Sequence, residues 1–347
     1  MINLYEFSFD ELVEFLGDLG EKRFRARQIW DWMYDRRVDN FDAMTNLPRP
    51  LIARLNATAS LGTLEMVARR ISRDGTEKRL YRLADEQLIE SVLMPYDDKR
   101  KTACISSQAG CAMGCVFCAT GQMGFGRQLS ASEIFEQAMI FARDLAARRE
   151  RLSNVVFMGM GEPFHNYDAS LEAVHQLMNR LGIGARHITI STVGLAPQIR
   201  RFAHENLQVN LAVSLHKSGD AERSALMPVN RRWNIDELIN ACQYYVARTN
   251  RRVTFEWAAI AGENDTEEEA RRLGQLLAGL RCHVNIIPLN PTGGFTGTPA
   301  TAANLDRFIA VLRQFGISAT VRLRRGIDID AGCGQLKTAI LSRDQLA

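Results

Sequence analysis

The sequence predicts an α/β protein in which a partial barrel of six strand–helix units follows a smaller accessory domain. From Thr102 onward, short apolar runs of strand length alternate with longer segments of helical periodicity. Polar motifs follow several of these runs, and the carboxyl ends of strands are where the active sites of such barrels lie. The segment before Thr102 has a different pattern, with helical stretches first and alternating strands after them. A chain of 347 residues is long enough for both parts.

The accessory domain is predicted to span residues 1–96 and to begin with helices. Ser8 precedes an amphipathic segment, and serine in that position caps a helix. Two further helices are expected at 23–34 and 51–55, separated by a proline-containing break.

Three strands are expected in the second half of this domain, at 65–72, 78–83 and 89–94. Asp74-Gly75 lies between the first two, and Asp-Gly between alternating runs is a strong hairpin signal. The accessory domain is therefore predicted to contain both helices and strands.

The barrel core is predicted to span residues 97–335, with a C-terminal tail at 336–347. Its strands are expected at 103–106, 154–160, 187–192, 209–215, 252–260, 283–289 and 318–323. Helices are expected between them at 131–147, 171–181, 235–248, 267–280 and 304–315. Because crossover helices join parallel strands, the carboxyl ends of these strands are expected to meet at one edge.

Three cysteines with the spacing C-x-x-x-C-x-x-C, namely Cys111, Cys115 and Cys118, follow the first core strand. Three thiolates can ligate three irons of a cubane [4Fe–4S] cluster, which leaves the fourth iron open for chemistry. Structural zinc is the alternative, but it requires four ligands, and no second cysteine pair or nearby histidine is present in the sequence. This spacing is typical of the radical S-adenosylmethionine (SAM) enzymes.

The composition indicates the cellular compartment of the protein and limits the kinds of surface that it can offer to partners. A net charge of +3 is only mildly basic, so any nucleic-acid surface has to be a local patch. Seven cysteines with this grouping indicate a reducing compartment. The N-terminus lacks a basic stretch followed by an apolar one, and no apolar run is long enough to span a bilayer. The chain is therefore expected to be cytoplasmic and away from membranes. A monomer is expected as well, although these observations do not bear on it.

A glycine-rich motif, Met158-Gly-Met-Gly161-Glu162-Pro, closes the second core strand. Its glycines leave the backbone open to a ligand, and Glu162 is suited to bind an ammonium group. Alone the motif is an ordinary strand-end turn, but after the cysteine loop it predicts the site for the methionine part of SAM. Polar residues that end later strands extend the same rim: Ser191, Ser214, His216 and Asn290.

Cys333 lies between two glycines after the last strand, which is a poor position for burial and a good one for a mobile loop. Accessible thiolates on mobile loops carry out covalent chemistry. Cys104, shortly before the cluster cysteines, is the other thiol expected to face the pocket. Cys242 and Cys282 lie in apolar helical or helix-end contexts and are interpreted as packing residues.

Together these motifs closely resemble one family, the radical SAM methyltransferases that modify C2 of adenosine in 23S rRNA and in tRNA. The resemblance covers most of the chain. Its motifs are Cys104-Ile-Ser-Ser-Gln-x-Gly-Cys111, the cysteine triad, Met158-Gly-Met-Gly-Glu-Pro, Ile190-Ser-Thr, Ser214-Leu-His, Met227-Pro-Val-Asn, Asn285-Ile-Ile-Pro-Leu-Asn290-Pro and Asp328-Ile-Asp-Ala-Gly-Cys333-Gly-Gln-Leu.

The resemblance implies a role for each motif residue. It implies that Cys111, Cys115 and Cys118 hold the [4Fe–4S] cluster. It implies a SAM site formed by Gly161, Glu162, Ser191, Ser214, Leu215, His216 and Asn290. It also implies that Cys333 carries the methyl group as S-methylcysteine, that Cys104 forms a transient disulfide with it, and that Glu90 accepts a proton.

The resemblance further implies a reaction that uses two SAM molecules per turnover. One methylates Cys333, and the second yields a 5′-deoxyadenosyl radical that removes hydrogen from the S-methyl group. The carbon radical adds to adenine C2 and joins RNA to protein. Proton removal and attack of Cys104 on Cys333 then release the product and leave a disulfide. An electron donor such as flavodoxin or ferredoxin is expected.

Two alternatives remain at this stage. A related family methylates C8 of the same rRNA adenosine, and it carries Gly-Glu-Ala where this chain has Gly161-Glu162-Pro163, which favours C2. From a different class, a non-catalytic iron–sulfur or zinc RNA-binding protein would use the same cysteines without cleaving SAM.

RNA contact is expected to come from local basic clusters, because an adenine must be unstacked to reach the pocket. One cluster surrounds the predicted hairpin: Arg69, Arg70, Arg73, Lys78, Arg79, Arg82, Lys99, Arg100 and Lys101. A second lies on the predicted second helix: Lys22, Arg23, Arg25 and Arg27.

Overall fold

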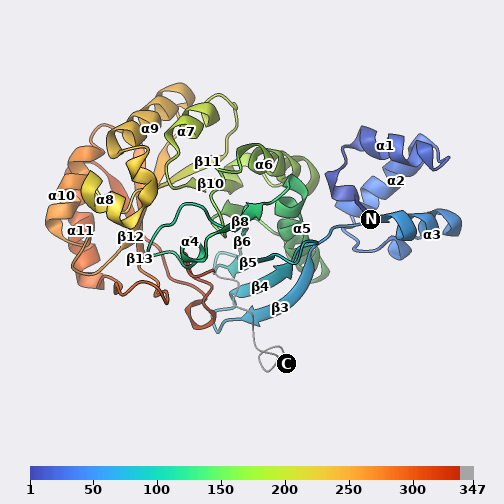
Figure 1. Ribbon diagram of the computed structural model, residues 1–347, viewed down its shortest axis with the longest axis horizontal. Coiled ribbons are helices and arrows are strands. Elements are labelled where there is room, and N and C mark those ends of the chain that lie inside the picture. Colours follow the sequence, from blue (N-terminus) through green and yellow to red (C-terminus); the bar gives the residue numbers. More distant parts are fainter. Residues whose placement is uncertain (337–347) are drawn as a thin grey trace.

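A computed structural model describes residues 1–336, and a ten-stranded mixed sheet forms its centre (Figure 1). The order of the strands is β14-β13-β12-β11-β10-β9-β6-β5-β4-β3. Its parallel part contains β6 (Lys101–Cys104), β9 (Asn154–Phe157), β10 (Ile188–Thr192), β11 (Asn210–Ser214), β12 (Val253–Ala259), β13 (Cys282–Pro288) and β14 (Ser318–Val321).

Helices connect these parallel strands and cover the outside of the curved sheet (Figure 1). They are α5 (Ala131–Ala147), α6 (Tyr167–Leu181), α7 (Ala196–Phe202), α8 (Asp220–Leu226), α9 (Ile235–Thr249), α10 (Glu267–Leu276) and α11 (Ala302–Gln314). The six strand–helix steps confirm the predicted partial barrel. Helix α5 has the predicted ends because Ser130 and Glu133 form a capping box at its start. Helices α7 and α8 were not predicted, since seven residues are too few for a clear periodicity.

Three antiparallel strands extend the sheet beyond β6: β3 (Glu65–Ile71), β4 (Glu77–Arg82) and β5 (Leu88–Pro95). The predicted hairpin turn is present, and Gly75 adopts a φ of +79° there. These strands were predicted to belong to the accessory domain, residues 1–96, together with the N-terminal helices. In the structure β5 pairs with β6 through a short turn, so the three strands share a sheet with the barrel.

The N-terminal helices α1 (Phe9–Asp18), α2 (Arg23–Tyr34) and α3 (Arg49–Thr58) form a separate group at one end of the molecule (Figure 1). As predicted, Ser8 caps the first of them, in a capping box with Glu11. The short strands β1 (Ile2–Asn3) and β2 (Ala59–Ser60) pair and close this group. Arg180 of α6 attaches it to the barrel by donating to the carbonyl of Tyr5 at 2.7 Å.

A buried carboxylate anchors the segment between the helical group and β3. Glu136 of α5 accepts the backbone N–H groups of Thr63 at 2.8 Å and Leu64 at 3.0 Å. Burial raises the pKa of Glu136 to about 7. This contact holds the chain as it passes from the helices to the sheet.

A smaller sheet of β7 (Gln108–Gly110) and β8 (Phe125–Gln128), together with α4 (Ala119–Met123), frames the cysteine loop. Apart from Leu336, the predicted C-terminal tail lies outside the described residues. Within residues 1–336, none of the helices combines the length and apolarity needed to cross a membrane.

Candidate active site

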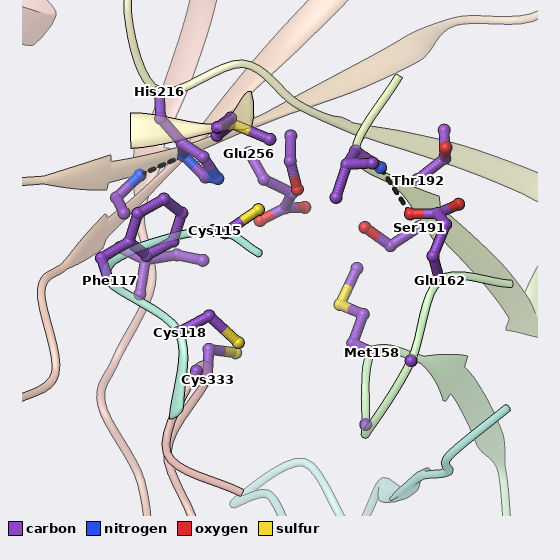
Figure 2. A pocket seen from close by; sticks show the side chains of 18 of the residues that line it. Cys115, Phe117, Cys118, Met158, Glu162, Ser191, Thr192, His216, Glu256 and Cys333 are labelled. Atoms are coloured by element: carbon purple, nitrogen blue, oxygen red, sulfur yellow. Dashed lines mark hydrogen bonds between the residues drawn. The ribbon is translucent and has the colours of Figure 1, made fainter. Parts of the chain in front are cut away.

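A cavity of about 880 Å³, its open mouth included, lies at the carboxyl ends of β9 to β13 (Figure 2). Most of the residues selected from the sequence line it: Cys115, Cys118, Gly161, Glu162, Ser191, Ser214, His216, Asn290 and Cys333. These residues come from six separate segments of the chain. The parallel topology brings them together because it places the ends of successive strands at one edge.

The cysteine loop runs between β7 and α4 along one wall of this cavity. Cys115 and Cys118 face the cavity, and Cys111 is buried. The N–H of Val116 donates to the carbonyl of Leu226 at 3.0 Å, which holds the loop against the end of α8. The loop therefore presents its thiols toward the interior rather than toward solvent.

The chemistry of these thiols fits an iron–sulfur cluster. Burial raises the pKa of all three, to about 12 for Cys111, so thiolates form there only if a cationic group compensates them. Within residues 1–336, no three His, Cys, Asp or Glu side chains converge in the way a single metal ion requires. Ligands of a cubane bind three different irons, so they need not converge on one point. The three neighbouring thiols therefore fit three irons of such a cluster.

The glycine-rich turn after β9 forms the opposite wall. A Cβ atom on Gly159 would lie 2.7 Å from the backbone of Ile105, and one on Gly161 would lie 2.6 Å from the Gln108 side chain. Gly161 also has a φ of +100°, which L-residues rarely adopt. Glycine is required at both positions, so that the turn can pack against the chain that follows β6.

Glu162 is held at the base of the cavity by backbone donors. Its carboxylate accepts the N–H of Val193 at 2.7 Å and the N–H of Phe164 at 3.0 Å. Burial is the larger influence and raises the pKa of Glu162 to about 7. The carboxylate is thus fixed in position and partly uncompensated, as expected of a receptor for an ammonium group.

His216 closes the upper side of the cavity, where Phe117 packs edge-on against its ring at 4.9 Å (Figure 2). Its Nδ1 accepts the N–H of Ala258 at 2.9 Å, so the neutral ring carries its proton on Nε2. Burial, with a contribution from Arg223, lowers the pKa of His216 to about 3. The imidazole therefore remains a neutral hydrogen-bond donor at physiological pH.

Leu215 does not line the cavity, and its side chain is fully buried. Its carbonyl accepts a hydrogen bond from Nε of Arg223 at 3.1 Å. Arg223 also donates to the carbonyls of Val193 and Ser214, at 2.7 and 3.0 Å. This buried guanidinium joins the ends of β10 and β11, so it sets the spacing of the rim.

Cys333 lies next to the cysteine loop, and Figure 2 shows its side chain beside that of Cys118. The N–H of Ala119 donates to the carbonyl of Gly334 at 2.7 Å, and Asn290 Nδ2 donates to the carbonyl of Cys333 at 3.0 Å. Cys333 also lines a second, smaller cavity. The thiol thus stands where two cavities meet.

Cys104 lines this second cavity together with Cys333, and all seven cysteines carry free thiols. Burial raises the pKa of Cys104 to about 12. Glu90 lies on β5 and is buried outside both cavities. Val92 pairs with Cys104, so Cys104 and Glu90, two residues before Val92, point to the same face of the sheet.

Two charged residues of the site escaped the sequence analysis. Glu256 of β12 is buried at the cavity, where Asn285 Nδ2 donates to it at 2.7 Å. Arg322, just after β14, lines the second cavity with both candidate thiols. The sequence did contain a signal for both residues, because each is a charged residue inside or at the end of an apolar strand. Charged side chains are seldom buried without a partner, so such a position marks a candidate site residue.

The prediction of a basic surface around the hairpin is wrong for two of the basic residues in that cluster. Lys78 and Arg79 of β4 are only 8% and 2% exposed. Arg79 pairs with Glu77 and Asp144, and its guanidinium lies over the ring of Phe141 on α5. Because α5 covers one face of β4 and the Cys333 loop meets the other, neither side chain reaches solvent. Arg69, Arg73, Lys99 and Arg100 remain exposed.

Comparisons with known proteins agree with this geometry. Residues 2–61 match the ribosomal RNA large subunit methyltransferase N-terminal domain, and residues 105–274 match the radical SAM superfamily. The chain is 49% identical to dual-specificity RNA methyltransferase RlmN 1 of Myxococcus xanthus, over 99% of this chain and 96% of that one. It is 45% identical to the probable dual-specificity RNA methyltransferase RlmN of Staphylococcus aureus, over 96% and 92%.

A solved structure is also similar over nearly the whole chain. The crystal structure of a radical SAM methyltransferase from Sphaerobacter thermophilus matches with a TM-score of 0.93 and 48% sequence identity. The match covers 96% of this chain and 99% of that one.

Proposed function

Since this chain belongs to the RlmN family of dual-specificity RNA methyltransferases, which are radical SAM enzymes, we propose that it methylates C2 of adenosine in 23S rRNA, at rRNA position 2503, and in tRNA. The observation that carries the proposal is that Cys333, Glu162 and the cluster cysteine Cys118 face one cavity. Adenine C2 is not nucleophilic, so it does not attack the electrophilic methyl group of SAM. A protein thiol that carries the carbon solves this problem.

The candidate site residues fall into two groups, those that bind the cluster and those that bind SAM. Cys111, Cys115 and Cys118 hold the [4Fe–4S] cluster, which supplies the electron for reductive cleavage of SAM when it is bound. Glu162 receives the ammonium group of SAM, while backbone groups freed by Gly161 bind its methionine part. The other SAM contacts come from the rim: Ser191, Ser214, the backbone of Leu215, His216 and Asn290. The external electron donor is a flavodoxin or ferredoxin.

Cys333 carries the transferred carbon in two stages, and two SAM molecules are consumed per turnover. It first attacks the methyl group of one SAM. The 5′-deoxyadenosyl radical from the second SAM then takes a hydrogen atom from that S-methyl group, and the carbon radical bonds to adenine C2 as a thioether. The joined radical species loses one electron, which the oxidised cluster would take back, and Glu90 removes the proton from adenine C2. Cys104 then attacks the sulfur of Cys333, the sulfur–carbon bond breaks, and its electron pair passes to the carbon, which takes a proton and becomes the product methyl. A Cys104–Cys333 disulfide remains for reduction.

A substrate adenine has to leave its stack to reach a buried cavity, so loops and partly folded RNA are favoured. The exposed basic residues nearest the β5–β6 turn, Lys99 and Arg100, are proposed to contact phosphates. Lys22, Arg23 and Arg27 of the helical group are also exposed and extend this proposed surface.

Glu162→Gln is expected to weaken SAM binding by about tenfold or more, because a charge-assisted hydrogen bond to the ammonium group is lost. The pKa of Glu162 is about 7, so protonation removes the same interaction in the native protein. SAM affinity should therefore fall as the pH is lowered from 8 to 6 and be nearly flat in the variant. Calorimetric titration of the cluster-loaded protein measures both effects.

Glu136→Gln is the matched control for that experiment. Glu136 is likewise buried, accepts two backbone N–H groups and has a pKa of about 7, but it lies outside the cavity. It should bind SAM with native affinity and native pH dependence. Equal losses in the two variants would contradict the assignment of Glu162.

The proposed product is tested on the RNA itself. Unmodified 23S rRNA and tRNA fragments are incubated with the reconstituted enzyme, SAM and a reductant, then digested to nucleosides. Chromatography with mass spectrometry separates 2-methyladenosine from 8-methyladenosine. We expect the C2 isomer from both RNAs, whereas the C8 isomer would replace the proposal. SAM cleavage without any methylated adenosine would also refute it.

A further inference from the structure

Glu90, the proposed proton acceptor, forms a buried ion pair with Lys78. Lys78 Nζ lies 3.1 Å from Oε1 of Glu90, and the side chains are only 9% and 6% exposed. The pair spans two neighbouring antiparallel strands: Lys78 of β4 lies opposite Val92 of β5, and Glu90 is two residues away on the same face. The β4–β5 register therefore fixes where the carboxylate can lie.

The same ammonium group also binds the loop that carries Cys333. Lys78 Nζ donates to the carbonyl of Asp330 at 3.2 Å, three residues before Cys333. Asp330 has a φ of +53°, in the left-handed region that a non-glycine residue seldom adopts. A charged donor on its carbonyl supports this turn, which directs the chain toward the cavity.

The turn between β3 and β4 holds the beginning of this loop. The hydroxyl of Ser72 and the N–H of Arg73 both donate to the carboxylate of Asp328. In return, the carboxylate of Asp74 accepts the N–H of Gly326 at 2.9 Å. Of the hairpin contacts, the one from Lys78 also reaches Glu90, so it joins the loop to the base.

We propose that Lys78 is a positioning residue that sets the Glu90 carboxylate and the Cys333 loop in register for proton removal and product release. The inference rests on the proposed function, in which Glu90 acts on a species attached to Cys333. Proton transfer requires the base within hydrogen-bond reach of the carbon acid. One cation that binds both the base and the Cys333 loop links their positions directly.

A role in stability alone accounts poorly for this arrangement. A buried ion pair contributes little net stability compared with an apolar pair of similar size. The two contacts together point to alignment.

The test compares Lys78→Met, which keeps the aliphatic stem, with Lys78→Arg, which keeps the charge. Each variant is measured for SAM-dependent methylation of Cys333 and for release of the covalent protein–RNA species. We expect Lys78→Met to methylate Cys333 normally and to release RNA about 100-fold more slowly. Lys78→Arg should recover at least a tenth of the native release rate. Release at the native rate in Lys78→Met would overturn the proposal.

A double variant separates alignment from general damage. If Lys78 acts through Glu90, Lys78→Met combined with Glu90→Gln should release RNA no more slowly than Glu90→Gln alone. Multiplied defects would overturn the proposal. Lys217→Met is the matched control, since Lys217 is also 8% exposed and bonds a backbone carbonyl, that of Glu263. It should release RNA normally.

The remaining outcomes distinguish a failure of the proposal for Lys78 from a failure of the proposed function. If Lys78→Met loses the cluster and Cys333 methylation while Lys217→Met does not, Lys78 has a structural role and the proposal is wrong. If Cys333 is methylated but Glu90→Gln accumulates no adduct, the role of Glu90 in the proposed function fails, and the role of Lys78 fails with it.

Discussion

Cys104→Ala is expected to accumulate a covalent protein–RNA species, whereas Cys333→Ala is expected to form none. The carrier sulfur must bind the transferred carbon, so its removal prevents the bridge from forming. Cys104 acts only afterwards, when it attacks Cys333 and releases the product. Both thiols line the second cavity, but Cys333 also lines the large one, where SAM is proposed to bind. This geometry supports Cys333 as the carrier.

The measurement is a denaturing gel of each variant after incubation with RNA, SAM and reductant. A retarded band that survives denaturant and disappears with nuclease identifies the adduct. Nearly all of the Cys104→Ala protein that turns over should be trapped, and peptide mapping should find the RNA-derived mass on Cys333. Cys242→Ala is the control, because Cys242 is a fully buried thiol on α9 outside both cavities.

The reverse pattern would assign the carrier role to Cys104. Absence of an adduct from both variants would mean that the thioether bridge never forms. Methylation of Cys333 in the Cys104→Ala protein is a separate readout, since it requires only the first SAM.

Cys118→Ala is expected to abolish the visible absorbance of the cluster and all SAM cleavage. A cubane held by three thiolates loses a third of its protein ligands in this variant. Anaerobic reconstitution followed by absorption spectroscopy and detection of 5′-deoxyadenosine measures both losses. Activity should fall to background.

Cys282→Ala is the matched variant for this prediction. Cys282 is partly exposed at the start of β13 and lies outside both cavities. It should bind iron and cleave SAM as the native protein does. An intact, active cluster in Cys118→Ala would contradict the assignment of the cysteine triad, and a colourless zinc-containing native protein would favour a non-catalytic role.

Local patterns predicted the elements well. Ser8 with Glu11, and Ser130 with Glu133, cap their helices through contacts three residues apart, which a sequence displays directly. The strands that carry the motifs also lie where alternation predicted them. Their polar residues meet in one cavity because parallel topology follows from the alternation of strands and helices.

Contacts between side chains far apart in the sequence could not be predicted from local patterns. The sequence analysis assigned Lys78 and Arg79 to a basic surface, but both are buried against partners far along the chain. Arg79 binds Asp144 of α5, and Lys78 binds the carbonyl of Asp330. Glu256 and Arg322 were overlooked for the same reason, since the groups that they contact or face lie on other segments of the chain.

The sequence by itself was enough to predict the chemistry, because the triad Cys111, Cys115 and Cys118, the turn at Gly161-Glu162 and the thiol of Cys333 belong to contiguous motifs whose spacing carries the information. Only the tertiary structure decided how these pieces are connected. It joined β5 to β6, which brought Glu90 onto the same face as Cys104, and it placed the ammonium group of Lys78 between Glu90 and the Cys333 loop. The physical reason is that charge pairing and burial depend on which strands become neighbours, and the strand register is set by packing over the whole sheet rather than by any local stretch.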